Sequence, residues 1–411
     1  MSKDQWNVEG RWYTSPWNFL PEARADLRFP EKVIFHDISL RDGEQQTGII
    51  LTRDDKVEIA KRLATAGIDR IEAGMPIVSP QDEAAIKDIV QLDLGPQIYA
   101  FSRCMVPDIK KAKECGVTGV IVEIPSSAHM IELAYGWPLE RAINLSIEAT
   151  LVAKEEGLDT VFFTIDSSRA EFDWYLDLIE KIATEGHMDG LGLVDTTGGV
   201  APQAVPVWVD KVRERLPDVR LEAHFHEDFG MSVANSLAAL AAGAEVVHTT
   251  VTGIGERAGN TPMEEVALAL TMLYGVDHNL VSQEFYKLSR FVQERTGHQI
   301  PSNRAAVGER LFEIESGIIA GWYERCVDDH PTEVFPYHWD VVGQPPGRIV
   351  YGKGSGLPSV TIAMKALGLS ADDEQLRGLL AAIKERSLET KALLPFEEVA
   401  RLAEQHVKGA G

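Results

Sequence analysis

Eight short, apolar, strand-like segments recur between residues 33 and 251, and this rhythm constrains the fold more than any other feature of the chain. They lie at residues 33–38, 69–74, 97–101, 119–124, 160–165, 190–195, 221–226 and 246–251. Longer amphipathic stretches separate them; residues 54–67, for example, carry apolar side chains at helical spacing and end in a glycine. Alternating strands and helices predict parallel βαβ units, and eight such units close into a (β/α)8 barrel, the TIM barrel.

An open, doubly wound α/β sheet is the main structural alternative. Sheets of that kind usually carry a glycine-rich phosphate-binding loop after the first strand. Here the residues after Ile38 read SLRDGEQQ, which does not resemble such a loop. The pattern therefore favours the closed barrel.

The alternation of strand and helix patterns stops near residue 280, which indicates more than one structural region. Residues 1–30 are aromatic and polar and predict an N-terminal extension, and residues 31–285 predict the barrel. Residues 286–411 predict a mainly helical C-terminal subdomain. The total of 411 residues fits a barrel of about 250 residues and a smaller second region.

Charge and cysteine usage narrow the classes of partner and compartment. The chain has 40 Lys and Arg residues against 63 Asp and Glu, a formal charge of −23. Such a surface disfavours binding to nucleic acid or to anionic membranes. No apolar run is long enough to predict a membrane span, and the N-terminus lacks the apolar core of a signal peptide. The three cysteines form no CxxC pair, which favours a reducing, cytoplasmic location.

Polar and ionisable side chains stand at the predicted carboxyl ends of the strands. In a TIM barrel the active site is built at that end. They include Arg41, Asp42, Glu72, Arg103, Glu123, His129, Asp195, Thr196, His224, His226, Glu256 and Asn260. A structural barrel does not need so many ionisable groups on one rim, so we expect an active site there.

His224 and His226 give the strongest local signal for a metal. Their spacing of two residues places both side chains on one face of a strand, toward the barrel interior. Two imidazoles and a carboxylate suit a divalent ion with open coordination positions. One core histidine and one rim histidine with satisfied hydrogen bonds is the alternative. Asp42, which barrel closure brings near them, favours the metal interpretation.

Arg41 and Asp42 form a pair with two interpretations. The arginine can neutralise an enolate or a substrate carboxylate while the aspartate binds metal. The alternative is a salt bridge that closes one end of the barrel. Glu72 would orient Arg41 or a ligand, because a buried carboxylate needs a partner. Asn260, in the glycine-rich segment 253–260, is either a turn residue or a ligand.

Five motifs, in order along the chain, resemble the metal-dependent, Claisen-type family of 2-isopropylmalate, homocitrate and citramalate synthases. They are DISLRDGEQ (37–45), IEAGMP (71–76), LVDTTGGVAP (193–202), HFHEDFG (224–230) and GIGERAGN (253–260). The resemblance covers roughly residues 33–320, and HMG-CoA lyase belongs to the same superfamily. It implies a TIM barrel, one divalent ion (Mg, Mn or Zn), and enolate chemistry on an acyl-CoA and a 2-oxo acid.

The resemblance also assigns roles by position. It implies metal ligation by Asp42, His224, His226 and Asn260, and stabilisation of the 2-oxo acid or enolate oxygen by Arg41. It implies substrate binding by Gln45, Glu72, Arg103 and Thr196. It further implies a homodimer, because the C-terminal region of the family crosses to the partner's barrel.

The proton-transfer residues of the family are replaced in this chain. Ile165 stands where the synthases have a glutamate, and Ile319 stands where they have a histidine that reaches the partner's site. Isoleucine cannot act as a general base. We predict that Asp166 or His129 takes this role, with Tyr323, His330 and His338 as further candidates.

Three functions are open from the sequence. A synthase joining an acyl-CoA to a 2-oxo acid ranks first, because segment 253–260 follows the synthase version of this loop. A lyase or aldolase acting on a metal-bound 2-hydroxy acid ranks second, favoured by the changes at Ile165 and Ile319. The HMG-CoA lyase branch carries a catalytic cysteine in the loop that corresponds to residues 253–260. This chain has no cysteine between Cys115 and Cys326, which argues against an ordinary HMG-CoA lyase. A non-catalytic, metal-binding regulatory homologue ranks last.

Overall fold

Eight parallel strands close into a barrel in the computed structural model, which describes residues 5–408. In sequence order they are β3 (Ile34–Asp37), β4 (Arg70–Glu72), β5 (Gln97–Arg103), β6 (Gly119–Pro125), β7 (Asp159–Ile165), β8 (Gly190–Asp195), β9 (Arg220–Phe225) and β10 (Val246–Thr249). Each strand pairs with the next, and β10 pairs with β3 to complete the ring, with His248 opposite His36. The predicted TIM barrel is confirmed, and the open-sheet alternative is excluded.

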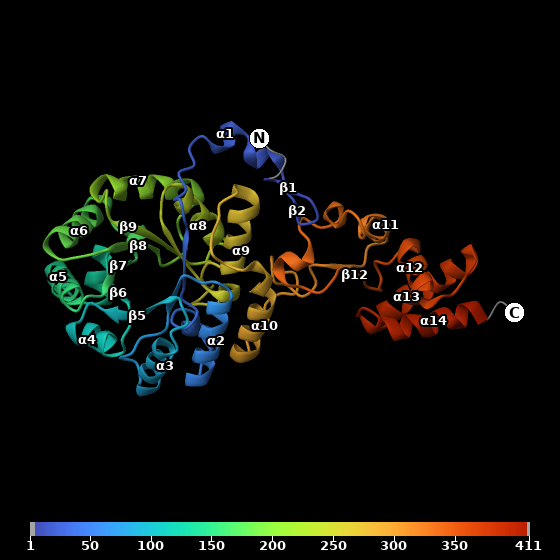
Figure 1. The fold of residues 1–411 in the computed structure, drawn as a ribbon, viewed down its shortest axis with the longest axis horizontal. Helices are drawn as coiled ribbons and strands as arrows, with labels where there is room; N and C mark the ends of the chain where they lie inside the picture. The colour runs from blue at the N-terminus through green and yellow to red at the C-terminus, as the bar shows by residue number, and fades with distance from the viewer. Residues whose placement is uncertain (1–4, 409–411) are drawn as a thin grey trace. The chain divides into compact units, whose positions relative to one another are not determined.

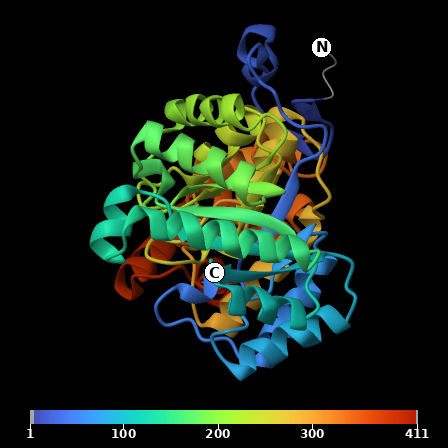
Figure 2. The same cartoon turned by 90° about the vertical axis from the view of Figure 1, so that its left-hand side faces the viewer.

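Helices surround this barrel on its outer side (Figure 1, Figure 2). They are α2 (Arg53–Thr65), α3 (Pro80–Gln91), α4 (Val106–Glu114), α5 (Leu139–Glu155), α6 (Phe172–Glu185), α7 (Val205–Arg215), α8 (Ser232–Ala241), α9 (Met263–Ala269) and α10 (Phe285–Thr296). Helix α2 shows how the sequence sets their bounds. Thr52 and Asp55 cap its first turn reciprocally. Gly67 follows its end at φ 81°, where a Cβ would lie 2.3 Å from the Asn279 carbonyl oxygen.

The barrel interior contains an apolar cluster and a polar layer. Alternate residues of β5, β6 and β7 point to one face, so Tyr99, Phe101, Ile121, Val161 and Phe163 pack together with Val194. The polar layer is formed by four fully or almost fully buried residues, His36, Arg70, Glu222 and His248. The barrel interior that supports the carboxyl ends of the strands is therefore partly ionic.

Residues 17–300 form the barrel unit, and residues 5–16 with 301–408 form a second compact unit. The predicted boundary at residue 285 differs because α10 packs on α2; Arg62 of α2 lies 3.8 Å from the centre of the Phe291 ring. The predicted extension over residues 1–30 is not one element. Residues 1–4 lie outside the described part of the chain, and residues 5–16 belong to the second unit, where Trp12 bridges to Tyr337. Residues 17–30, which include α1 (Pro21–Arg24), belong to the barrel unit.

The second unit is mainly helical, as predicted. Its helices are α11 (Gly317–Cys326), α12 (Leu357–Leu367), α13 (Asp373–Thr390) and α14 (Phe396–Lys408). Two small sheets accompany them, β1 (Asn7–Val8) with β2 (Trp12–Tyr13), and β11 (Glu313–Ile314) with β12 (Arg348–Ile349). Over residues 5–408, no helix is both long enough and apolar enough to cross a bilayer.

Candidate metal centre and active site

Asp42, His224 and His226 meet at the carboxyl end of the barrel. Asp42 follows β3, His224 lies on β9, and His226 comes directly after that strand. The two Nε2 atoms are 3.3 Å apart, and Asp42 Oδ2 lies 3.6 Å from His224 Nε2 and 4.0 Å from His226 Nε2. Atoms bound at about 2.1 Å to one ion in tetrahedral or octahedral geometry stand about 3.0–3.4 Å apart. The three buried groups thus converge on one centre, close to the spacing that a cation requires.

Asn260 joins this group from the last loop of the barrel. Its Nδ2 donates to Asp42 Oδ1 over 2.8 Å, and its Oδ1 is buried without a hydrogen-bond partner in the part of the chain that the structure describes. Gly255, at φ 154°, lets this amide approach, because a Cβ there would lie 2.0 Å from Asn260 Nδ2. An orphaned buried oxygen beside a carboxylate and two imidazoles fits a divalent cation.

The charge states of these residues also suit metal ligands. Burial acts to raise the pKa of Asp42, but the neighbouring Arg41 and His226 and the Asn260 hydrogen bond outweigh it, so the pKa lies below its usual value. Burial, then the neighbouring His226 and His248, hold the pKa of His224 well below its usual value. An ionised aspartate and a neutral histidine are the forms that bind metal.

Arg41 is fixed beside the candidate metal site by three contacts. Its Nη1 donates to Asp42 Oδ2 over 2.8 Å, its Nε donates to Glu72 Oε1, and its guanidinium lies 4.1 Å from the centre of the Phe101 ring. Within residues 5–408 its buried Nη2 has no hydrogen-bond partner. One oriented donor is therefore available for a substrate oxygen. Of the two roles that the sequence left open for Glu72, orienting Arg41 or a ligand, the structure shows the contact with Arg41.

Asp166 and His129 form a second polar pair, at the ends of β7 and β6. Asp166 is fully buried at φ 64°, a left-handed conformation that is strained for a side chain larger than glycine. Its Oδ2 lies 3.0 Å from His129 Nε2 and accepts from Ser127 Oγ over 2.5 Å, while Oδ1 accepts from Arg169. The His129 side chain is 48% exposed. A buried carboxylate thus orients a half-exposed imidazole.

The remaining predicted substrate residues are not all gathered at one point. Thr196 Oγ1 accepts from the backbone amide of Asp166 over 2.8 Å, which places it beside the Asp166 turn. Arg103 makes two hydrogen bonds to Asp108, and its side chain is 54% exposed. Gln45 is exposed, whereas its neighbour Gln46 accepts from the Gly255 amide over 3.2 Å.

A small pocket adjoins Arg103 at the ends of β5 and β6. It has a volume of about 230 Å³, and its lining includes Arg103, Glu123, Tyr135, Trp137 and Arg141. Burial raises the pKa of Glu123 to about 7, although Arg41 and Arg103 act to lower it. The sequence analysis singled out Glu123 but not Tyr135, Trp137 and Arg141, which also line the pocket. The aromatic and basic residues within 135–141 were the signal that could have indicated them.

His36, Glu222 and His248 also bring three ligand atoms within 4.8 Å of one another, deeper in the barrel. Glu222, however, already accepts from Arg70 Nη1 over 3.0 Å and from Arg220 Nε over 2.7 Å. Two guanidinium groups neutralise the only anionic ligand, so a cation at this point would face net repulsion. This cluster is a structural ion-pair layer.

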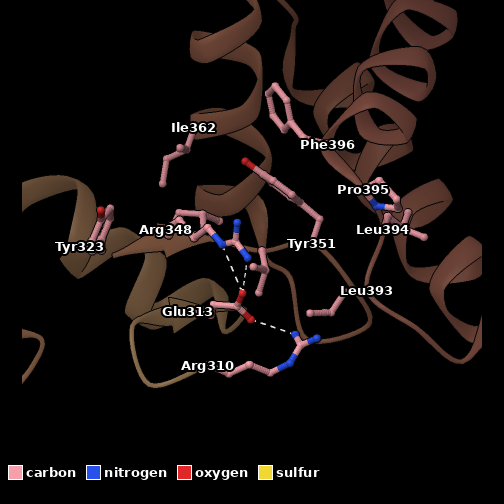
Figure 3. A pocket seen from close by; sticks show the side chains of 12 residues that line it. Arg310, Glu313, Tyr323, Arg348, Tyr351, Ile362, Leu393, Leu394, Pro395 and Phe396 are labelled. Atoms are coloured by element: carbon pink, nitrogen blue, oxygen red, sulfur yellow. Dashed lines mark hydrogen bonds and ion pairs between the residues drawn. The ribbon is translucent and has the colours of Figure 1, made fainter. Parts of the chain in front are cut away.

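The C-terminal candidates for proton transfer lie in the second unit. Tyr323 lines a pocket of about 600 Å³, in which Glu313 lies between Arg310 and Arg348 (Figure 3). Its hydroxyl donates to the Gly347 carbonyl oxygen. His338 accepts from the Asp340 amide over 3.3 Å, and His330 lines a separate pocket near residues 7–13.

The family model described as HMGL-like matches residues 32–292. The chain is 37% identical over 366 residues to homocitrate synthase AksA of Methanopyrus kandleri, covering 89% of this chain and 90% of that one. It is 35% identical over 357 residues to the 2-isopropylmalate synthase of Methanocaldococcus jannaschii, covering 87% and 68%. The chain belongs to the HMGL-like family, and the family and enzyme class predicted from its motifs are confirmed.

Solved structures share the fold at lower identity. The HMG-CoA lyase of Brucella melitensis superimposes with a TM-score of 0.59 at 20% identity, covering 66% of this chain and all 100% of that one. The lyase of Pseudomonas aeruginosa gives 0.59 at 20% identity, covering 66% and 95%. These likenesses concern the barrel fold.

Proposed function

We propose that this chain catalyses a metal-dependent, Claisen-type condensation of an acyl-CoA with a 2-oxo acid. One observation carries the proposal: the ligand atoms of Asp42, His224 and His226 converge on one centre, and Arg41 and Asn260 both donate to Asp42 there. The similarity to named synthases over most of both chains supports it. When bound, Mg²⁺, Mn²⁺ or Zn²⁺ supplies Lewis acidity toward the oxo group of the acid.

Arg41 supplies the fixed positive charge for this reaction. Its Nη2 donates to the carboxylate or the developing oxyanion of the 2-oxo acid. Glu72 and Phe101 hold the guanidinium, so it does not need to reorient during the reaction. Asp42 takes part twice, as a metal ligand and as the acceptor for Arg41 Nη1.

His129 is the general base in this proposal, and Asp166 positions it. The imidazole removes a proton from the α-carbon of the acyl group, beside the thioester carbonyl. The resulting enolate carbon attacks the oxo carbon of the acid, and the former oxo oxygen takes up a proton to become a hydroxyl group. Water then hydrolyses the thioester and releases CoA with its thiol. The 3.0 Å contact with a fully buried carboxylate and the half-exposed ring support this role. It would replace the groups absent at Ile165 and Ile319.

Thr196 and the pocket near Arg103 complete the proposed substrate site. Thr196 fixes the turn that carries Asp166, and Gln45 lies on the rim next to the Arg41–Asp42 pair in sequence. Arg103, Glu123 and the aromatic wall accommodate the variable end of the 2-oxo acid.

Cleavage of a 2-hydroxy acid is the second candidate function. The replacement of both family proton-transfer groups by Ile165 and Ile319 favours it. The same metal ligands and Arg41 would serve the reverse reaction, with His129 removing the hydroxyl proton. Thiol release and 2-hydroxy-acid cleavage are separate readouts of the two directions.

The deciding experiment measures thiol release from acetyl-CoA by metal-loaded protein across a panel of 2-oxo acids, with Asp42→Asn as control. Release that needs both a 2-oxo acid and Asp42 is the expected result. A protein that binds one divalent ion per chain, releases no thiol and cleaves 2-hydroxy acids would overturn the synthase proposal. His129→Asn should lower the release rate about 10²–10⁴-fold if the imidazole is the base.

A further inference from the structure

A chain of hydrogen bonds runs from the buried Glu222 to the metal site. His248 Nε2 lies 2.9 Å from Glu222 Oε2, and His248 Nδ1 lies 3.3 Å from His224 Nδ1. The rings of His224 and His248 meet edge to face, with centroids 5.4 Å apart. All three residues are at most 1% exposed, so water does not compete for these contacts.

The chemistry of these groups fixes which nitrogens carry hydrogen. Glu222 Oε1 accepts from two guanidinium groups, Arg70 over 3.0 Å and Arg220 over 2.7 Å, and such partners favour an ionised carboxylate. An ionised carboxylate only accepts, so His248 Nε2 carries a hydrogen toward it. A ring with one hydrogen then accepts at Nδ1, and His224 Nδ1 donates to it. The lone pair of His224 Nε2 consequently points toward Asp42 and His226.

His226 reaches the same tautomer through a different partner. Its Nδ1 lies 3.2 Å from the carbonyl oxygen of Gly259, which can only accept. Two Nε2 lone pairs therefore face each other at 3.3 Å, which is repulsive unless a cation lies between them. The hydrogen bonds on the far side of each ring point both imidazoles at one centre.

Glu222, at one end of this chain of hydrogen bonds, is held in place by several contacts. Arg70 and Arg220 bind its Oε1 from two sides. Arg220 also bonds Asp159 over 2.9 Å, and Asp159 accepts from the Tyr99 hydroxyl over 2.8 Å. These contacts tie Glu222 to strands β4, β5, β7 and β9, so the carboxylate cannot follow a movement of His248.

We propose that His248 is a positioning residue that holds His224 in the Nδ1–H tautomer, with Glu222 as the fixed acceptor behind it. This inference rests on the proposed metal site. Partners of this kind behind a metal-binding histidine commonly contribute 10–100-fold to metal affinity.

The test compares wild type with His248→Phe, His248→Asn and Glu222→Gln, using ¹⁵N-histidine NMR of the metal-free protein and calorimetric titration with Mn²⁺. The expected results are a single Nδ1–H tautomer of His224 in wild type, and a mixture in His248→Phe with 10–100-fold weaker Mn²⁺ binding. His248→Asn keeps an acceptor oxygen and should restore part of the affinity. His278→Asn, which removes a part-buried imidazole elsewhere in the barrel unit, serves as the control.

Two results would overturn the inference: an Nε2–H tautomer for His224 in wild type, or wild-type Mn²⁺ affinity in His248→Phe. The NMR readout needs no metal, so it also tests the tautomer if wild type binds no divalent ion. If wild type binds no divalent ion, the result contradicts the proposed metal site and not the tautomer of His224. If His248→Phe does not fold, the wild-type tautomer and the Asn variant still decide.

Discussion

At the scale of single residues, this site depends on side chains held by more than one contact. Arg41 has two anionic partners and an aromatic ring, yet one of its buried donors, Nη2, has no partner among residues 5–408. The resemblance could assign Arg41 a role, but a sequence does not reveal which of its nitrogens is already occupied. That depends on the placement of Glu72 and Phe101, which lie 31 and more residues away in the chain.

Replacing Arg41 by lysine tests the value of this geometry. Lysine keeps the charge but lacks the planar fork that bonds Asp42 and Glu72 together. We expect kcat for thiol release to fall about 10²–10³-fold, while circular dichroism shows an intact fold. Arg213→Lys, on α7, is the matched control. Equal effects of both variants would contradict a specific role for Arg41.

Glu123 should make stability depend on pH. Its pKa is raised to about 7 in the folded protein from an ordinary value of 4.5, so its ionisation opposes folding. The penalty is absent below pH 4.5, grows between pH 4.5 and 7, and is complete above pH 7. Glu123→Gln should therefore gain up to about 3 kcal/mol of stability relative to wild type between pH 5 and pH 8.

Urea denaturation of both proteins at the two pH values measures this change. Glu214→Gln, at a largely exposed position on α7, controls for the loss of one negative charge. A stability difference between Glu123→Gln and wild type that is the same at pH 5 and pH 8 would contradict the shifted pKa.

At the scale of elements, the strand pattern predicted the barrel but not the details of its ends. The run at 246–251 predicts six strand residues, whereas β10 ends at Thr249 because the chain turns at Val251–Gly253. Asp166 adopts a left-handed backbone that no local signal indicated. Arg70 pairs with Glu222, 152 residues away in the sequence, because the barrel closes. The periodicity of apolar residues within one strand or helix does not predict such a long-range contact.

The last barrel loop should be intolerant of side chains at Gly255. A Cβ there would lie 2.0 Å from Asn260 Nδ2 and displace the amide from Asp42. We expect Gly255→Ala to weaken Mn²⁺ binding at least tenfold. Gly230→Ala is the matched control, because Gly230 also has positive φ (72°) but nothing within 4 Å of its Cβ. Gly230→Ala should lower the free energy of unfolding by only about 1 kcal/mol and leave the Mn²⁺ affinity unchanged.

At the scale of the whole molecule, we expect the homodimer that the family resemblance implies. On α11, Ile318 and Trp322 are one helical turn apart and 70% and 46% exposed, a pattern typical of a surface that another chain covers. Light scattering at micromolar concentration should give twice the chain mass.

Ile318→Glu should shift this equilibrium toward the monomer. Leu388→Glu, the same change at an exposed position of α13, reports whether an added charge alone has this effect. A monomeric wild type would contradict the expectation of a dimer.

The polar layer beneath the proposed metal site has a consequence for how this sequence can change in evolution. Glu222 contacts Arg70, Arg220 and His248, so replacing any one of these four residues leaves a buried charged or polar group without its partner. Their substitutions should be strongly non-additive, with large coupling in double-mutant cycles. Sequences that descend from this one are expected to keep these four residues together or to replace them together, so the four are inherited as a single unit.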